Sequence, residues 1–306
     1  MSLFWSRARS AKLCWCHNER IMAKHSVKVG LIQTKVGDDL QNNLDKTASF
    51  IKKAAKKGAE IVCLQELFAS RYFAQTKDEA FFDIAEKATG NLSTFLADCA
   101  SQNRVLLIGG SIYEKGDDGK YYNTTLIYDQ RGKLAGKYRK MHIPHDPNYY
   151  EQYYFTPGDI GYVQVNTGST IVAPLICYDQ WFPEAARINA INGAEVIFYP
   201  TAIGWFKELK RDEPFSARRW EDAMRAHASL NGIFTAAVNR VGREGDLRFW
   251  GGSFVADPFG EVIARASHSK EEVLIAKLDL SRIRQSQEGW RFLHNRRPNS
   301  YTDIVR

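Results

Sequence analysis

The feature that most constrains the fold of this chain is a repeated alternation of short apolar runs with longer segments of helical period. The segment 40–57 has apolar residues at helical spacing and is followed by Gly58, which is typical of a helix end. The run 61–67 is almost continuously apolar, as expected for a strand that is buried on both faces. Alternation of this kind predicts an α/β fold.

The same alternation continues along the rest of the chain. Further helices are predicted at 91–103, 183–192, 216–230 and near 281–287. Strands are predicted at 28–33, 61–67, 105–113, 121–128, 133–139, 162–165, 170–177, 195–199, 233–240, 252–256, 262–266 and 273–279. Turn residues such as those at 129–132 join several of these strands as hairpins, so the sheets should be mixed rather than purely parallel.

The first 25 residues differ from the rest of the chain. They are basic, have no clear periodicity and lack the apolar segment of a secretory signal. We expect residues 1–25 to be a leader that is disordered, a targeting segment or a non-native extension, with Met22 as an alternative start. Without a linker or repeat beyond them, residues 26–306 are predicted to form a single domain.

Composition excludes some classes of protein. The chain lacks the roughly 18 consecutive apolar residues of a membrane helix. Its net charge is +7, but the basic residues outside the leader alternate with acids or lie on solvated helix faces, which argues against a nucleic-acid partner. Five cysteines without framework spacing indicate a reducing compartment, the cytoplasm. Cys63 and Cys99 have core positions, and the pair Cys14 and Cys16 lacks enough partners for a metal site.

Three apolar strands of the predicted fold end in chemically reactive side chains. Glu66 follows one such run, Lys140 another and Cys177 a third. Because sites gather at the carboxyl ends of strands in open α/β sheets, these three side chains could share one pocket. Spacing alone leaves open that Cys177 is a core residue and that the other two are surface charges.

The chemistry of these three groups is complementary. A carboxylate could take the proton of the Cys177 thiol, and an ammonium could stabilise the resulting negative charge. Pro183 suits the first turn of a helix, so the thiol should lie near a helix N-terminus, which predicts a favoured thiolate. The backbone N–H of Tyr178 would then face the oxyanion. Such a site suits attack on an amide, ureide or nitrile, with no metal and no organic cofactor.

Three motifs in the chain resemble those of the carbon–nitrogen hydrolases, the nitrilase superfamily. The segment 175–187 is similar to the cysteine motif, Gln65-Glu66 to the glutamate motif and 138–144 to the lysine motif, in the same order. The resemblance covers roughly residues 27–301 and implies that Glu66, Lys140 and Cys177 are catalytic. It also implies a four-layer α-β-β-α sandwich of two mixed sheets, and homo-oligomers, dimers or larger, joined through the outer helices.

The resemblance also implies roles for two further residues. Glu151 matches a second glutamate that positions the substrate and the lysine, and Tyr178 provides an aromatic wall where many relatives have Trp. The segments 142–159 and 198–205 look like the branch that hydrolyses N-carbamoylputrescine to putrescine, carbon dioxide and ammonia in polyamine biosynthesis. The expected partner is therefore a small carbamoyl amine. Its ammonium needs an acceptor, for which the nearby acids are Asp146, Asp159 and Glu184.

Three alternatives remain at this stage. A sister amidase such as β-ureidopropionase would use the same three residues, but its acidic substrate would need a cation in the pocket. A papain-like thiol hydrolase would pair Cys177 with His142 or His145. A basic nucleic-acid-binding protein is the remote alternative, and its binding would depend on salt.

Overall fold

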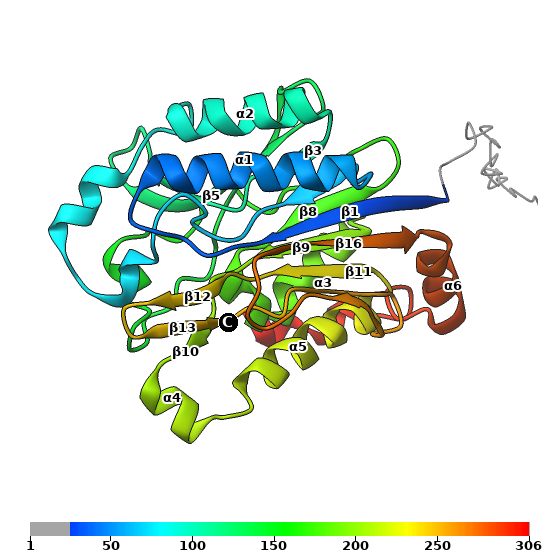
Figure 1. Ribbon diagram of the computed structural model, residues 1–306. Helices are drawn as coiled ribbons and strands as arrows, with labels where there is room; N and C mark the ends of the chain where they lie inside the picture. Colours follow the sequence, from blue (N-terminus) through cyan, green and yellow to red (C-terminus); the bar gives the residue numbers. More distant parts are fainter. Residues whose placement is uncertain (1–24, 306) are drawn as a thin grey trace, which may run out of the picture.

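The computed structural model describes residues 25–305, and two β-sheets packed face to face dominate it (Figure 1). The first sheet has seven strands in the order β16-β1-β2-β3-β5-β4, with β6 paired to β5. Its strands are β1 (Ser26–Gln33), β2 (Ile61–Cys63), β3 (Leu106–Ile108), β4 (Ile112–Lys115), β5 (Tyr121–Tyr128), β6 (Leu134–Arg139) and β16 (Glu272–Asp279). Because β1, β2 and β3 are parallel and the other pairs are antiparallel, the sheet is mixed, as predicted.

The second sheet has six strands in the order β15-β14-β11-β9-β8-β7. Its strands are β7 (Val165–Asn166), β8 (Ile171–Pro174), β9 (Val196–Pro200), β11 (Phe234–Val238), β14 (Phe254–Ala256) and β15 (Val262–Arg265). The central strands β8, β9 and β11 are parallel, whereas those at both edges are antiparallel. This sheet is therefore mixed as well.

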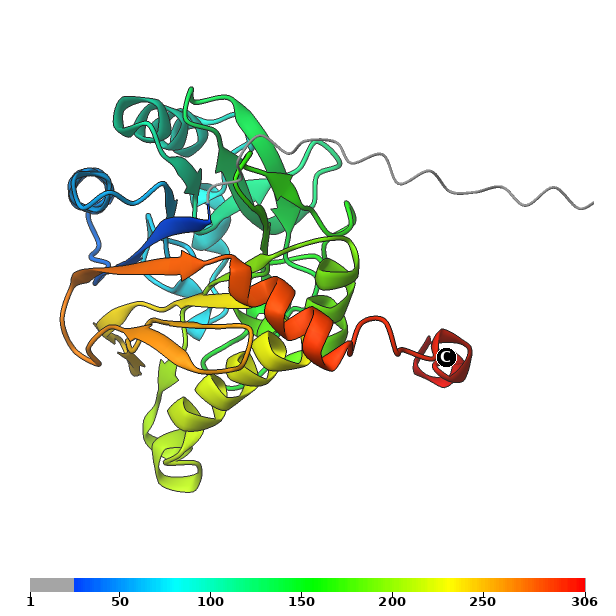
Figure 2. The same cartoon turned by 90° about the vertical axis from the view of Figure 1, so that its right-hand side faces the viewer.

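Helices cover the outer faces of both sheets. The helices α1 (Leu40–Lys56) and α2 (Asn91–Asn103) lie on the first sheet, and α3 (Pro183–Ile191) and α5 (Ser216–Asn231) lie on the second (Figures 1 and 2). One apolar cluster fills the space between the sheets, a second lies under α1 and α2, and a third under α3 and α5. The predicted four-layer α-β-β-α sandwich is thus confirmed.

Local sequence explains where the first helix begins and ends. The side chain of Asp39 accepts a hydrogen bond from the backbone N–H of Asn42 at 2.7 Å, which caps the N-terminus of α1. After the helix, Gly58 adopts a φ of 85°, a conformation that favours glycine. The helix predicted at 40–57 is therefore correct to within one residue.

Some short elements were not predicted from the sequence. A third, three-stranded sheet contains β10 (Gly204–Trp205), β12 (Val241–Glu244) and β13 (Leu247–Trp250), and α4 (Lys207–Asp212) follows β10. After β16, α6 (Ser281–Trp290) extends the short helix that was predicted there. Six 3₁₀ turns complete the described part: η1 (Phe73–Gln75), η2 (Glu79–Ile84), η3 (Glu151–Tyr153), η4 (Cys177–Trp181), η5 (Pro298–Ser300) and η6 (Thr302–Val305). Such short elements have too little periodicity for recognition in a sequence.

Several predicted strands were too long, and of the strand predicted at 162–165 only Val165 lies in a strand, β7. The segment 105–113 forms two strands, β3 and β4, because Gly109 and Gly110 break it. Strand β2 ends at Cys63 rather than at 67, and β8 ends at Pro174 rather than at 177. In the last two cases a buried run continues past the end of the strand into a turn, so burial alone does not mark where a strand ends.

Two predictions made from composition have different outcomes. Cys63 and Cys99 are free and buried in apolar clusters, which confirms their predicted core positions. The predictions for the leader, including Met22 and the pair Cys14 and Cys16, concern residues outside those that the structure describes.

No helix within the described residues combines the length and the apolar character that crossing a bilayer requires.

Candidate active site

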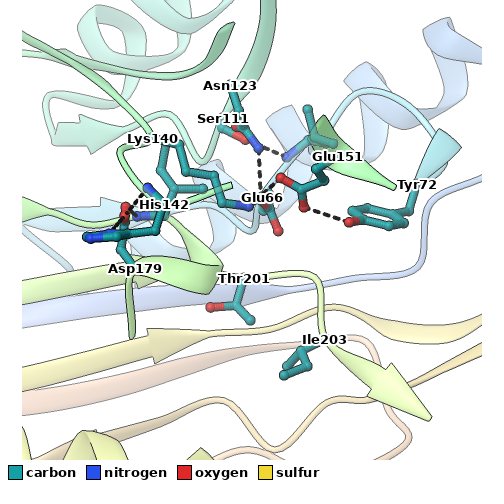
Figure 3. Close-up of polar contacts among 12 residues, drawn as sticks. Glu66, Tyr72, Ser111, Asn123, Lys140, His142, Glu151, Asp179, Thr201 and Ile203 are labelled. Carbon is teal, nitrogen blue, oxygen red and sulfur yellow. Dashed lines mark hydrogen bonds and ion pairs between the residues drawn. The ribbon is translucent and has the colours of Figure 1, made fainter. Parts of the chain in front are cut away.

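The structure brings Glu66 and Lys140 into direct contact. Figure 3 shows the ammonium of Lys140 between two carboxylates, with Nζ 2.9 Å from Glu66 Oε1 and 2.6 Å from Glu151 Oε2. Glu66 follows β2, Lys140 comes directly after β6, and Glu151 begins η3. All three side chains are fully buried, so two carboxylates share one cation away from solvent.

Asn123 on β5 connects the two sides of this cluster. Its side-chain amide donates to Glu66 Oε1 at 2.9 Å, and its backbone carbonyl accepts the N–H of Lys140 at 2.9 Å. The second oxygen of Glu66, Oε2, is buried and has no hydrogen-bond partner among the described residues. Glu66 is thus fixed through one oxygen, while the other remains available to accept a proton.

A tyrosine completes the cluster on the side of Glu151. The hydroxyl of Tyr72 donates to Glu151 Oε1 at 2.6 Å (Figure 3). Both oxygens of Glu151 are therefore engaged, one by Tyr72 and one by Lys140. This arrangement suits a residue that orients the ammonium rather than one that exchanges protons.

A sharp turn, and not the end of a strand, positions Glu66. Leu67 adopts a φ of 46°, and its N–H donates to Ser111 Oγ at 2.9 Å. At Gly110, with a φ of 62°, an added Cβ would lie 2.0 Å from the carbonyl oxygen of Gln65. The glycine therefore permits a close approach of two backbone segments directly beside Glu66.

Cys177 also lies in a turn, at the start of η4 rather than at the end of a strand. It has a φ of 43°, a conformation that is uncommon outside glycine. The carboxylate of Asp179 holds this turn, because it accepts the N–H of Ile176 at 2.9 Å and the hydroxyl of Tyr138 at 2.7 Å. Pro183 begins α3, so the predicted strand-to-helix turn is present.

The expectation of a favoured thiolate at Cys177 was wrong. Burial raises the pKa of the thiol well above its ordinary value, and the negative charge of Glu66 adds to the increase. Lys140 and the backbone N–H of Ala202 lower this pKa, but they do not outweigh burial and the two carboxylates. The helix α3 begins six positions beyond the thiol, at Pro183, and its N-terminus is not among the causes that lower this pKa.

The charges in the cluster also shift the pKa values of its other members. Burial raises the pKa of Glu151 to about 7, although Lys140 and Tyr72 oppose the increase. Burial on its own would lower the pKa of Lys140, but the attraction of Glu151 and Glu66 raises it above its ordinary value. The lysine therefore stays charged, and Glu151 titrates near neutral pH.

Neither candidate histidine is arranged as a base for Cys177. The Nδ1 atom of His142 lies 2.7 Å from Asp179 Oδ1, and its ring stacks on Phe182 with the ring centres 3.6 Å apart. The ring of His145 packs edge-on against Tyr150. The charged groups that shift the pKa of the thiol are Glu66, Lys140 and Glu151, and neither histidine is among them, which argues against a papain-like pairing.

A cavity of about 590 Å³ opens onto Cys177 and Glu151. Its remaining wall is mostly apolar and aromatic, and includes Tyr149, Tyr178, Trp181, Ile203, Phe206 and Trp250. The expected aromatic wall at Tyr178 is therefore present. Its charged residues away from the buried cluster are Asp146, Glu213 and Arg219.

Only one of the three acids suggested as acceptors lies in this cavity. Asp146 lines it, whereas Asp159 pairs with Arg139 at 2.8 Å and Glu184 lies in the first turn of α3. Glu213 and Arg219, which flank the start of α5, were not predicted. They lie far from the three motifs in sequence, and only the folded chain brings them to the cavity.

Comparisons with known proteins agree with this geometry. The family model of the carbon–nitrogen hydrolases matches residues 28–288. An N-carbamoylputrescine amidase of Solanum lycopersicum is 38% identical over 287 residues, which are 91% of this chain and 95% of that protein. A citrullinase of Francisella tularensis is 35% identical over 92% of this chain and 99% of its own length.

A solved structure supports the same assignment. The crystal structure of a carbon–nitrogen hydrolase from Helicobacter pylori has a TM-score of 0.88 and 38% sequence identity to this chain. The match covers 92% of this chain and 99% of the other. Fold, motifs and relatives therefore agree: the chain belongs to the carbon–nitrogen hydrolase family and is a hydrolase that acts on carbon–nitrogen bonds.

Proposed function

We propose that this enzyme hydrolyses N-carbamoylputrescine to putrescine, carbon dioxide and ammonia, with Cys177 as nucleophile. The observation that carries this proposal is the buried cluster of Glu66, Lys140 and Glu151 beside a thiol that lines a largely apolar cavity. The relatives named N-carbamoylputrescine amidase support the choice of substrate. Neither a metal nor an organic cofactor takes part in the proposed reaction.

In the first half of the proposed reaction, the Cys177 sulfur attacks the ureide carbon of the substrate. Its proton passes to the open oxygen of Glu66, because the thiol is protonated before the attack. The ammonium of Lys140 and the backbone N–H of Tyr178 stabilise the negative oxygen of the tetrahedral intermediate. Glu66 then returns the proton to the departing amine, which leaves a thioester-type acyl-enzyme.

In the second half, water replaces the amine. Glu66 takes a proton from this water as its oxygen attacks the acyl carbon, and the carbon–sulfur bond breaks with return of the proton to Cys177. The carbamic acid released decomposes to carbon dioxide and ammonia. Throughout both halves, Glu151 holds the ammonium of Lys140 in place.

The far end of the cavity suits a substrate with a distal cation. The aromatic faces of Trp181 and Trp250 can contact the methylene chain and attract an ammonium. Asp146 and Glu213 provide carboxylates, of which Glu213 is the less exposed. Asp146 and Glu213 would repel a carboxylate at the end of the substrate, as in N-carbamoyl-β-alanine, and only Arg219 among the charged residues of the outer wall could attract it.

A citrulline-type substrate is the second candidate, because one residue favours it. Arg219 also lines the cavity, and its guanidinium lies 3.4 Å from Glu213. Citrulline has the same carbamoyl amine group, and its other end has both an ammonium and a carboxylate, so this ion pair could bind both charges. The relative named citrullinase supports this alternative.

Ammonia release from a panel of substrates tests the proposal. The panel contains N-carbamoylputrescine, citrulline, N-carbamoyl-β-alanine and agmatine, each measured as kcat/KM at one pH. We expect N-carbamoylputrescine to exceed N-carbamoyl-β-alanine by roughly a hundredfold or more, with agmatine not hydrolysed. A preference for citrulline would support the second candidate, and equal values for the two carbamoyl compounds would contradict the proposed specificity.

We further infer that the enzyme acts as a homo-oligomer, a dimer or larger. Apolar side chains are exposed on the outer helices, among them Ile188 and Ile191 on α3 and Leu230 on α5. Trp290 at the end of α6 is 63% exposed. Burying these side chains between copies would remove apolar surface from water. Sedimentation velocity tests this inference, and a monomer at micromolar concentration would contradict it.

A further inference from the structure

A second buried ion pair lies behind the proposed reaction centre. Arg240, between β11 and β12, donates from Nη1 to Glu244 Oε1 at 2.8 Å. The two side chains are 0% and 3% exposed, and neither lines the cavity. Burying a charged pair is costly unless its remaining groups are also bonded, and both terminal nitrogens of Arg240 have partners, whereas its Nε has none among the described residues.

The second amino group of Arg240 forms hydrogen bonds with the turn that contains Glu66. Its Nη2 atom donates to the backbone carbonyl of Glu66 at 2.7 Å and to that of Leu67 at 2.9 Å. Leu67 is the residue with a φ of 46°, so the turn is held in an unfavourable backbone conformation. The guanidinium therefore fixes the backbone of Glu66 and, through it, the place of the Glu66 carboxylate.

Glu244 reaches the other carboxylate of the cluster. Its Oε2 atom accepts the backbone N–H of Tyr72 at 2.7 Å, and the hydroxyl of Tyr72 donates to Glu151 at 2.6 Å. The two ends of a single ion pair are thus connected to Glu66 and to Glu151. The chain 240–244 belongs to the second half of the sequence, whereas Glu66 and Tyr72 belong to the first.

We propose that Arg240 and Glu244 are positioning residues that set the places of Glu66 and Glu151 around the ammonium of Lys140. The inference rests on the proposed roles of these three residues, but not on the identity of the substrate. A planar guanidinium can bond one carboxylate and two carbonyls at once, which the single ammonium of a lysine cannot do with the same geometry. Small displacements of reacting groups have large effects on rate.

Two conservative variants test the proposal, Arg240→Lys and Glu244→Gln. Each keeps a buried polar group of similar size but weakens the connection to the turn or to Tyr72. We expect kcat to fall on the order of 10- to 100-fold, with KM little changed, because the cavity wall is intact. Circular dichroism and the melting temperature establish that the variants are folded at the assay temperature.

Arg282→Lys is the matched control for the arginine substitution. Arg282 on α6 is 40% exposed, but it pairs like Arg240 with a buried carboxylate, that of Asp257 at 2.5 Å, and neither residue of this pair lines the cavity. A purely structural role predicts that Arg240→Lys and Arg282→Lys lower the melting temperature without changing kcat below it. The positioning role predicts a fall in kcat for Arg240→Lys alone.

A double-mutant cycle provides an independent readout. If Glu244 acts through Tyr72, then Glu244→Gln and Tyr72→Phe should together cost little more in kcat than the worse of the two alone. Additive losses, or wild-type kcat in folded Arg240→Lys and Glu244→Gln, would overturn the inference. Glu66→Gln distinguishes failure of this inference from failure of the proposed function. Full activity of this variant would refute the catalytic role of Glu66 itself, whatever Arg240 and Glu244 do.

Discussion

The ammonium of Lys140 lies 2.6 Å from Oε2 of Glu151, and neither side chain has any exposed surface. Opposite charges that are buried together stabilise each other, and removal of one leaves the other buried without that partner. The same ammonium also contacts Glu66, so its position depends on both carboxylates.

Glu151→Gln should abolish most activity in a folded protein. The amide retains a bond to Tyr72 or to Lys140, but it no longer attracts the ammonium by its charge, so the ammonium shifts toward Glu66. We expect kcat to fall by roughly two orders of magnitude or more. Glu271→Gln, which alters a partly exposed pair with Lys46, is the control and should have normal kcat. Wild-type kcat and KM in Glu151→Gln would refute its positioning role.

The pH dependence of activity should show an acidic limb near pH 7. Because burial raises the pKa of Glu151 to about 7, the carboxylate becomes protonated as the pH falls through this value, and the orientation of Lys140 is lost. Activity therefore rises with pH across the limb. The hydroxyl of Tyr72 lowers this pKa, so Tyr72→Phe should move the limb to higher pH in plots of kcat/KM. A limb that is unchanged in Tyr72→Phe would contradict this assignment.

The distal acids should contribute to substrate binding to different extents. We expect Asp146→Asn, at an exposed position, to raise KM for N-carbamoylputrescine only a few-fold. Glu213→Gln, which is less exposed, should raise it about tenfold. N-butylurea has the same chain without the ammonium and is the control substrate, with a KM that neither change should affect. Equal effects on both substrates would show that these acids do not bind the ammonium.

Gly110→Ala should destabilise the fold around Glu66. An added Cβ would overlap the carbonyl oxygen of Gln65, so the backbone beside Glu66 would have to move. Gly119→Ala is the matched control, because its φ of 77° is also positive but the space around it is open. The control should cost roughly 1–2 kcal/mol of unfolding free energy from its backbone conformation alone. Similar melting temperatures for the two variants would contradict the argument for a close approach.

The sequence was sufficient to predict the layers of the fold, because long periodic segments such as 40–57 and 91–103 carry a clear signal. It also predicted the residues of the buried cluster, since Glu66, Lys140 and Glu151 lie in recognisable motifs. What it could not predict was the local backbone. The turns at Leu67 and Cys177 follow apolar runs that look like strand, and their positive φ angles depend on tertiary contacts.

Partners that come from distant parts of the chain were also missed. Tyr72, Asn123 and Arg240 carry no local pattern that distinguishes them from core or surface residues, and only the folded chain connects them to the carboxylates. The error in the pKa of Cys177 has a similar cause. A turn near a helix could be inferred from Pro183, whereas full burial beside two carboxylates could not.

The most direct test of the whole account is ammonia release from N-carbamoylputrescine by Cys177→Ala, beside the wild-type enzyme and Cys99→Ala. Cys99 is a buried core thiol on the inner face of α2, so its substitution should cost stability and leave turnover unchanged. If Cys177 is the nucleophile, the wild type and Cys99→Ala should release ammonia, and a folded Cys177→Ala should release none. Near-normal ammonia release by Cys177→Ala would contradict the proposed mechanism.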